Sequence, residues 1–365
     1  MMRSRAAVLT AFAHPLEIRE FPFTPLAEGE VRVRVRAAGV CGSDVHISRG
    51  RDPRVPLPLI LGHEGVGEIE ETGGPKRDIH GRELKPGDLV VWERGIVCGR
   101  CVYCAIHKRP ALCLSRRTYG ISVGCGSAPH LRGAYAEYIH LLADTHLIRV
   151  DGNVPPSALA VATCAGATAA HAIEQAGLRP GDTVLLIGPG PMAIFATALA
   201  RAAGAGRIIV FGTRRSESRL TMARHMGADD TLVIDGTSLE ERLAFVRDRT
   251  FGLGAPVVIE CAGTVSAVEE AIQHVAPCGV CLLPGVATPI GRVAVSAFEH
   301  VARRNARIQG VWVSDASHLS QAVRLIVENR FPFADLVTHR VPLEGANEAL
   351  AAVENRSAVK AVIEP

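Results

Sequence analysis

The chain has 365 residues, which is more than one compact core usually holds, so we expect two domains. Hydrophobic residues make up 48% of the sequence and charged residues 21%, a balance that excludes a disordered or fibrous chain. The net charge is only +3 and the basic residues are spread along the sequence, so we expect no nucleic-acid partner.

No targeting or membrane segment is predicted. The apolar run at residues 6–9 is too short for the core of a secretory signal. The longest weakly apolar stretch, residues 158–173, is built mainly of Ala, Thr and Gly and lacks the ~20 strongly apolar residues that a membrane span needs. Four of the ten cysteines fall within residues 98–113, and such spacing without a signal indicates metal rather than disulfides. We therefore expect a cytoplasmic protein.

The first 150 residues read as β-rich. Residues 31–36 alternate apolar and basic side chains, the period of a strand with one solvated face. Pro and Gly interrupt the sequence closely, as at residues 53–58 and 85–88, which is typical of short strands joined by irregular loops.

From residue 181 onward, short β-branched runs alternate with helical patterns. This alternation predicts a parallel sheet with helices on both faces, a doubly wound α/β domain. Strands are expected at residues 183–188, 207–212, 231–235, 256–260 and 279–283, with helices at 192–203 and in the segment that ends at 226–227. Beyond residue 298 we expect a strand at 308–313, a helix at 316–329 and a strand–helix–strand tail at 341–365.

A glycine-rich turn follows the first strand of this series. Gly188 permits the tight turn, and Gly190 lets the backbone approach a pyrophosphate. Pro191 and Met192 open the helix, whose free N–H groups attract phosphate, and Ala193 allows close packing of helix on strand. The motif predicts a dinucleotide site.

Four cysteines follow one another at spacings of two, two and eight intervening residues. Thiolates at these spacings can close a tetrahedron on Zn²⁺ without another segment, although free or redox-active thiols are the alternative. A closed four-Cys site leaves no position for substrate, so its role is structural. The cysteines are Cys98, Cys101, Cys104 and Cys113.

A second set of metal-binding residue types is dispersed along the chain. Catalytic zinc needs about three protein ligands and one open position. Cys41 and His63 can supply two ligands, and Cys164, just before the nucleotide-binding region, can supply the third. The spacing alone does not decide between this site and ordinary core or loop residues.

Together these signals resemble the zinc-containing medium-chain dehydrogenase/reductase family over essentially the whole chain. The resemblance rests on residues 39–44, 62–67, the four-Cys segment, 133–138, 181–193 and 258–263. It implies a GroES-like β-rich catalytic domain at 1–157 with a structural-zinc lobe at 98–113. A Rossmann domain at 158–298 follows, and residues 299–365 return to the catalytic domain.

The resemblance also implies roles for single residues. Cys41, His63 and Cys164 match the catalytic zinc ligands, and Glu64 matches a carboxylate that can enter as a further ligand. Asp44 matches the residue that orients the ligand histidine. The implied activity is hydride transfer between NAD(P) and an alcohol or the corresponding carbonyl compound.

Two further residues match a proton path. Ser43 matches the hydroxyl that takes the proton from the substrate oxygen and passes it through the cofactor ribose, and His46 matches the base further along that path, which exchanges it with solvent. Neither residue is needed for folding, which argues against a non-catalytic relative. A zinc-free carbonyl or quinone reductase of the same fold is the other alternative, and the coexistence of the zinc ligands argues against it.

The sequence also departs from the family pattern. The spacing of eight before Cys113 is one residue longer than usual, which a loop can absorb. Four cysteines have no family role and are expected to be buried as small apolar residues: Cys125, Cys261, Cys278 and Cys281. Family members associate through the nucleotide domain, so a homodimer or homotetramer is expected.

The end of the second Rossmann strand bears on cofactor choice. NAD-selecting domains carry an acidic residue there, whereas this chain has Gly212 and Thr213 followed by Arg214 and Arg215. Guanidinium groups match a 2′-phosphate, so NADP is favoured. Alternatively the arginines are solvated and NAD binds through the backbone and Thr213.

Substrate identity is the least determined feature. Residues 92–94, Trp-Glu-Arg, fall where members of this family line the substrate cleft. Charge at this place suggests a polyol, sugar, cyclitol or other polar alcohol, and a solvated surface turn is the alternative. The sequence thus predicts an enzyme with two zinc ions per chain, one catalytic and one structural.

Overall fold

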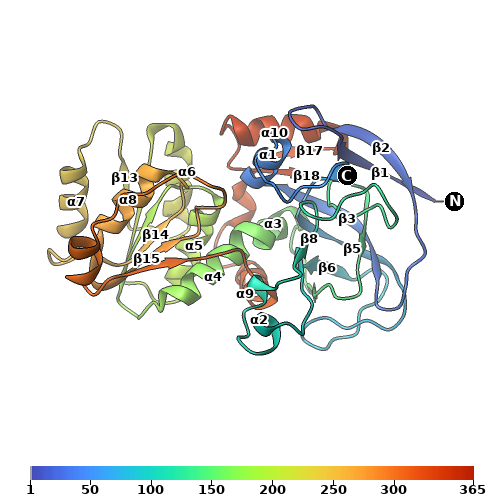
Figure 1. Ribbon diagram of the computed structural model, residues 1–365, viewed down its shortest axis with the longest axis horizontal. Helices are drawn as coiled ribbons and strands as arrows, with labels where there is room; N and C mark the ends of the chain where they lie inside the picture. Colours follow the sequence, from blue (N-terminus) through green and yellow to red (C-terminus); the bar gives the residue numbers. More distant parts are fainter. Residues whose placement is uncertain (1) are drawn as a thin grey trace. The chain divides into compact units, whose positions relative to one another are not determined.

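The computed structural model describes residues 2–365 and divides into two compact units. Among these residues, unit 1 comprises 2–164 and 314–365, and unit 2 comprises 165–313 (Figure 1). The chain thus leaves unit 1 after residue 164 rather than 157, because helix α3 (Pro156–Ala160) packs on strands of unit 1. It returns after 313 rather than 298, because strand β16 (Arg307–Gly310) extends the sheet of unit 2.

Unit 1 is built on a seven-stranded sheet in the order β10-β6-β5-β3-β18-β17, with β9 also paired to β3. Strand β18 from the C-terminal segment pairs antiparallel with β3, so the two ends of the chain share one sheet. The strands are β3 (Val31–Val40), β5 (Glu64–Thr72), β6 (Leu89–Trp92), β9 (Tyr138–Leu141), β10 (Leu147–Arg149), β17 (Val337–Val341) and β18 (Lys360–Ile363).

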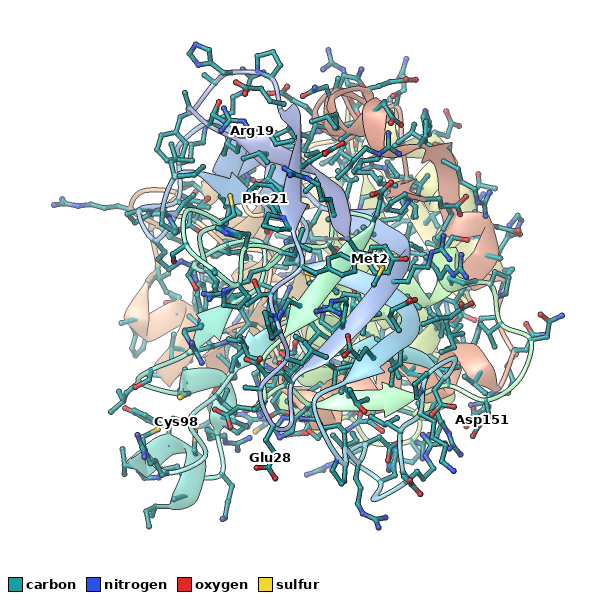
Figure 2. The ribbon with its side chains drawn as sticks, turned by 90° about the vertical axis from the view of Figure 1, so that its right-hand side faces the viewer. Met2, Arg19, Phe21, Glu28, Cys98 and Asp151 are labelled. Atoms are coloured by element: carbon teal, nitrogen blue, oxygen red, sulfur yellow. The ribbon has the colours of Figure 1, made fainter. Side chains whose placement is uncertain are left out.

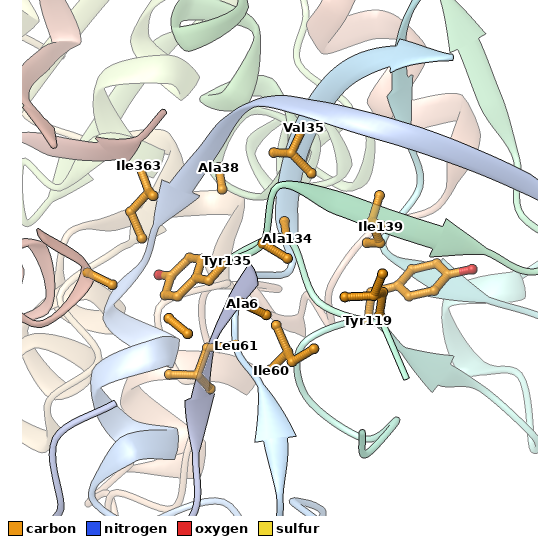
Figure 3. Close-up of a cluster of buried hydrophobic side chains, with 14 of the residues drawn as sticks. Ala6, Val35, Ala38, Ile60, Leu61, Tyr119, Ala134, Tyr135, Ile139 and Ile363 are labelled. Atoms are coloured by element: carbon orange, nitrogen blue, oxygen red, sulfur yellow. The ribbon is translucent and has the colours of Figure 1, made fainter. Parts of the chain in front are cut away.

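The expected alternation along β3 holds with one exception. Val31, Val33 and Val35 are buried while Arg34 is exposed, but Arg32 is buried and pairs with Glu71. The buried faces of this sheet and of the smaller sheet β2-β1-β4 close one apolar core. Figure 3 shows part of this core, where Tyr135 lies among side chains that include Leu61 and Ile363.

Short elements complete unit 1. The remaining strands are β1 (Arg3–Leu9), β2 (Glu17–Pro22), β4 (Leu59–Ile60), β7 (Gly95–Ile96) and β8 (Arg117–Thr118). The helices are α1 (Gly42–Ser48), α2 (Val102–Ala105), α3, α9 (Ala316–Val327) and α10 (Ala346–Glu354). The predicted helix at 316–329 and the predicted strand–helix–strand tail correspond to α9 and to β17, α10 and β18.

Unit 2 holds a six-stranded parallel sheet in the order β13-β12-β11-β14-β15-β16, which is the doubly wound Rossmann order. The predicted parallel sheet is confirmed, and each expected strand is present within a few residues. The strands are β11 (Thr183–Ile187), β12 (Arg207–Gly212), β13 (Asp230–Val233), β14 (Ala255–Glu260), β15 (Val275–Leu283) and β16.

The helices of unit 2 are α4 (Ala167–Ala176), α5 (Pro191–Ala202), α6 (Glu217–His225), α7 (Leu239–Arg247) and α8 (Val265–Gln273). The segment Pro156–Ala176 is the one helical stretch among the described residues that is long and apolar enough to cross a membrane. Its most apolar part is 89% buried inside the protein, as in the core helix of a globular fold. The Ala-rich composition therefore reflects close packing.

One expectation about the cysteines is wrong. Cys278 is exposed rather than buried, because it lies at a bulge of β15 with a positive φ of 62°. Cys125 and Cys281 are buried, and Cys261 is half-buried.

Candidate active site and zinc centres

Four metal-binding side chains of unit 1 converge, although the first and the last are 123 positions apart in the sequence. One ligand atom from each of Cys41, His63, Glu64 and Cys164 lies within 4.8 Å of the others. His63, Glu64 and Cys164 are buried, and Cys41 is half-buried. Two thiols, an imidazole and a neighbouring carboxylate form a donor set that zinc prefers.

Helix α1 positions Cys41 and its neighbours. Cys41 precedes the helix as its N-cap, and its backbone N–H donates to Asp44 Oδ2 at 2.8 Å. The Asp44 carboxylate is fully buried and also accepts a hydrogen bond from the hydroxyl of Tyr135 at 3.1 Å. Tyr135 was not singled out as a site residue, because an aromatic side chain in an irregular segment just before β9 looks like core in the sequence.

The second oxygen of Asp44 orients His63. Its Oδ1 lies 3.1 Å from His63 Nδ1, which leaves Nε2 for another partner. Nε2 is buried and has no hydrogen-bond partner among the described residues. Burial opposes protonation of His63, but the charge of Asp44 outweighs it and raises the pKa of the imidazole to about 10. An orphaned, buried ring nitrogen facing two thiols fits a metal ion, which would hold the histidine neutral.

Cys164 lies on a π-helical turn, η2 (Ala162–Gly166), between α3 and α4. Such turns are rare and frequently mark functional sites. The guanidinium of Arg94 donates from Nη1 to Cys164 Sγ. Trp92, Glu93 and Arg94 are all buried, so the alternative of a solvated surface turn is wrong.

Glu64 is held by a residue from the other end of the chain. Its Oε2 is paired with Nζ of Lys360 on β18, and both side chains are buried. Its other oxygen, Oε1, is buried and lacks a partner among the described residues. Sequence reasoning missed Lys360, because nothing in the tail shows that β18 lies beside β3.

Ser43 and His46 lie three residues apart on α1 and are both half-buried. Ser43 Oγ lies 3.8 Å from Cys41 Sγ, so the hydroxyl is next to the metal-binding cluster. Burial and the nearby charge of Arg51 lower the pKa of His46 below 6.5. No hydrogen bond joins Ser43 to His46 in the part of the chain that the structure describes.

Cys98, Cys101, Cys104 and Cys113 form a second cluster around α2. This is the lobe in which Figure 2 labels Cys98. Their sulfurs lie within 4.8 Å of one another, and the Sγ atoms of Cys101 and Cys104 are 3.5 Å apart, too far for a disulfide. Backbone N–H groups of Leu114 and Cys104 lower the pKa of Cys101 to about 6. Four thiols with thiolate-stabilising N–H donors fit zinc. The additional residue before Cys113 is accommodated by a 3₁₀ turn, η1 (Pro110–Leu112).

The glycine turn of unit 2 has the predicted geometry. Gly188 has φ of +95°, and a Cβ there would lie 2.8 Å from that of Ala262. Gly190 is the N-cap of α5, and no atom lies within 4 Å of where its Cβ would be, so its backbone is accessible to a phosphate. Pro191 and Met192 form the first turn of α5 and are half-buried. The turn fits a dinucleotide.

The end of β12 places the residues expected to select the cofactor. Arg214 and Arg215 are exposed, and Thr213 is half-buried. Gly212 is required by packing, since a Cβ would lie 2.8 Å from Pro189 Cγ. The carboxylate of Asp235 accepts the backbone N–H of Arg214 at 2.6 Å, so an acidic group does lie at this corner although the second strand has none.

Comparison with known proteins agrees with this arrangement. Residues 27–152 match the alcohol dehydrogenase GroES-like domain, and residues 191–328 match the zinc-binding dehydrogenase domain. The chain is 34% identical over 369 residues to 5-exo-hydroxycamphor dehydrogenase of Pseudomonas putida, covering 100% of this chain and 99% of that one.

Two solved structures extend the comparison. An alcohol dehydrogenase from Thermotoga maritima is 42% identical with a TM-score of 0.97, and each chain is covered completely. A zinc-binding dehydrogenase from Sinorhizobium meliloti, solved with NADP, is 25% identical with a TM-score of 0.87 over the full length of both chains.

The fold and the two cysteine-rich clusters define a nicotinamide-dependent oxidoreductase of the zinc-binding class. The chain belongs to the zinc-dependent medium-chain dehydrogenase/reductase family, as an alcohol dehydrogenase that carries out NAD(P)-dependent oxidoreduction of small-molecule alcohols or carbonyl compounds.

Proposed function

We propose that the enzyme binds two zinc ions per chain and oxidises a polar secondary alcohol, such as a polyol, sugar or cyclitol, or reduces the corresponding carbonyl compound. The single observation that carries the proposal is the buried cluster of Cys41, His63, Glu64 and Cys164, with an unpartnered His63 Nε2. Cys41, His63 and Cys164 would hold the catalytic ion. When bound, the ion polarises an oxygen ligand and lowers the pKa of a hydroxyl group.

Two residues of α1 would move the proton in the oxidising direction. The C–H bond of the carbinol would break with both of its electrons leaving as hydride, and a bound nicotinamide cofactor would supply the acceptor. The hydroxyl proton would pass to Ser43 Oγ and, since no hydrogen bond joins Ser43 to His46 among the described residues, would reach the ring of His46 by way of the cofactor ribose and exchange there with solvent. A pKa below 6.5 keeps His46 unprotonated at neutral pH and therefore able to accept the proton.

The side chains around the cluster would support a stable ion. Asp44 fixes His63 so that Nε2 faces the thiols, and Lys360 holds one oxygen of Glu64 while leaving the other without a partner. A carboxylate held in this way is positioned to approach the ion during ligand exchange. The cysteine cluster around α2 would carry the second, structural ion.

We further propose that NADP is the preferred cofactor and that NAD is the alternative. Arg214 and Arg215 are exposed at the end of β12, where a 2′-phosphate would meet two guanidinium groups. The backbone N–H of Arg214 is held by Asp235, which fixes the loop that carries both arginines.

Self-association, in a homodimer or homotetramer, is proposed through the outer edge of β16. This strand lies at the end of the sheet. Ile308 on the strand is 39% exposed, and Trp312, which follows the strand, is 41% exposed. An unpaired edge with apolar neighbours is a surface that a second copy of the chain can cover.

The metal content of a cysteine variant tests the proposal. Cys164→Ser should lose one of two zinc ions per chain and nearly all turnover, because a hydroxyl is a much poorer zinc ligand than a thiolate. Cys125→Ser removes a buried thiol of the same unit outside both clusters and should retain two ions. Full activity of Cys164→Ser, or one zinc ion in the wild-type protein, would instead favour a zinc-free reductase or a non-catalytic relative.

A further inference from the structure

Arg94 is a cation buried at the metal-binding cluster. Its side chain is 5% exposed, and Nη1 contacts Sγ of Cys164. The backbone on either side is fixed, since Glu93 donates its N–H to His146 and Arg94 accepts the N–H of Tyr119. The position of the guanidinium is therefore set by the fold.

The adjacent charge, Glu93, is directed elsewhere. Its Oε1 accepts hydrogen bonds from Gly95 N at 3.1 Å and from Arg116 Nη2 at 3.0 Å. Glu93 and Arg116 form an ion pair in which both side chains are at most 10% exposed. Glu93 therefore stabilises Arg116, and only Arg94 of the two charged neighbours reaches the metal-binding cluster.

The charges of the cluster explain why a cation there affects the choice of substrate. Glu64 is balanced by Lys360, whereas Asp44 adds one negative charge on the Nδ1 side of His63. Two thiolates would cancel the charge of one zinc ion, so the cluster without Arg94 would be net negative and would oppose an oxygen-rich or anionic ligand. The positive charge of Arg94, which lies beside Cys164 Sγ, offsets this net negative charge.

We propose that Arg94 determines specificity by donating hydrogen bonds to a second oxygen of the substrate, on the carbon next to the reacting carbon. This inference rests on the proposed function, and it narrows the substrates to vicinal diols and 2-hydroxy acids. A guanidinium offers several N–H donors in one plane and matches either a hydroxyl or a carboxylate oxygen. A short substrate can present only its adjacent oxygen to a group that borders the same ion.

Three alcohols with the same reacting centre test this role. Propan-2-ol, propane-1,2-diol and lactate are secondary alcohols that differ only in one substituent: methyl, hydroxymethyl or carboxylate. The wild-type zinc-loaded enzyme should show a kcat/KM for the diol or for lactate on the order of 10-fold to 100-fold above that for propan-2-ol, as expected for a hydrogen bond from a charged donor. Whichever of the two has the higher kcat/KM shows whether the second oxygen belongs to a hydroxyl group or to a carboxylate.

Variants of Arg94 distinguish recognition of the substrate oxygen from a purely structural contact with Cys164. In Arg94→Met, the kcat/KM for the oxygenated substrate divided by that for propan-2-ol should fall close to 1. Arg94→Lys should retain part of this preference. Arg117→Met removes an exposed cation from the same unit and should leave the ratio as in the wild type. Zinc per chain is measured for every variant, and Arg94→Gln serves if Arg94→Met folds poorly.

Binding provides a readout that does not depend on turnover. Calorimetric titration of the three alcohols into zinc-loaded enzyme with reduced cofactor, where no oxidation occurs, should give the same order of affinities. The role of Arg94 would be overturned if the wild type showed no preference for the oxygenated alcohols over propan-2-ol. It would also be overturned if that preference persisted in Arg94→Met with full zinc content. Absence of turnover with any alcohol would count against the proposed function, while the binding series would still decide the role of Arg94.

Discussion

Lys360 and Glu64 form a buried ion pair across a strand to which neither belongs. β5 and β18 both pair with β3, and Gly39 of β3 lies opposite Glu64 on one side and Val362 on the other. A Cβ on Gly39 would lie 1.9 Å from Glu64 Oε2 and 3.0 Å from Lys360 Cε. A glycine at this place therefore lets the last strand of the chain fix a carboxylate of the metal-binding cluster.

Removing Lys360 should destabilise unit 1. Lys360→Met leaves the buried Glu64 carboxylate without its counter-charge, a change that costs about 3–5 kcal/mol in comparable pairs. Urea unfolding of the zinc-loaded protein is followed by the fluorescence of Trp92, in a Trp312→Phe background so that unit 1 alone reports. The double variant Glu64→Gln with Lys360→Met removes both charges and should recover part of the loss. Equal stability of wild type and Lys360→Met would show that the pair contributes nothing.

The cysteine cluster around α2 should stabilise the protein without taking part in the reaction. Cys101→Ser should lose one zinc ion per chain and lower the unfolding temperature, because the lobe has few other buried contacts. Cys278→Ser makes the same chemical change at an exposed site outside both clusters and serves as the control. Unchanged metal content in Cys101→Ser would show that the cysteine cluster around α2 does not bind zinc.

The sequence predicted the parallel sheet well because local patterns determine it. Each strand of unit 2 is a short β-branched run bounded by a turn, and its alternation with helical patterns predicts parallel pairing. The four-Cys cluster was equally accessible, since all its ligands lie within sixteen consecutive residues.

Contacts over long sequence distances were not accessible. Lys360 reaches Glu64 only because β18 joins the seven-stranded sheet, and Tyr135 reaches Asp44 only because the segment before β9 folds against helix α1. The charge of Arg94 was visible in the sequence, but its contact with Cys164 depends on the fold of residues 70 positions apart. Single-residue patterns carry no signal for such pairs.

Cofactor choice can be tested at the end of β12. Changing Arg214 and Arg215 together to Ala should raise the KM for NADP by on the order of 10-fold or more, because charge-assisted hydrogen bonds to the 2′-phosphate are lost. The KM for NAD should stay within about twofold, since NAD has no such phosphate. Arg224→Ala removes an exposed arginine further along α6 and serves as the control. Higher catalytic efficiency with NAD in the wild type would contradict the proposed preference.

The acid limb of the pH–rate profile should report on His46. Burial and the charge of Arg51, whose Nη1 lies 3.5 Å from His46 Nδ1, lower the pKa of His46 below 6.5. A protonated imidazole cannot accept a proton, so turnover should fall as the pH drops through this lowered pKa, and the midpoint should lie below 6.5. Arg51→Gln removes the repulsion, and the midpoint should rise toward 6.5 without passing it, because burial remains.

Three comparisons decide whether this limb belongs to the proposed proton path. His46→Gln should abolish the limb but reduce turnover only modestly, because water can replace the imidazole, whereas Ser43→Ala should reduce turnover strongly at every pH. Both residues lie on α1 with Ser43 nearer to the metal-binding cluster, which is why the serine should be the harder one to replace. An acid limb that stays at the same pH in Arg51→Gln and persists in His46→Gln would assign it to another group and remove His46 from the path.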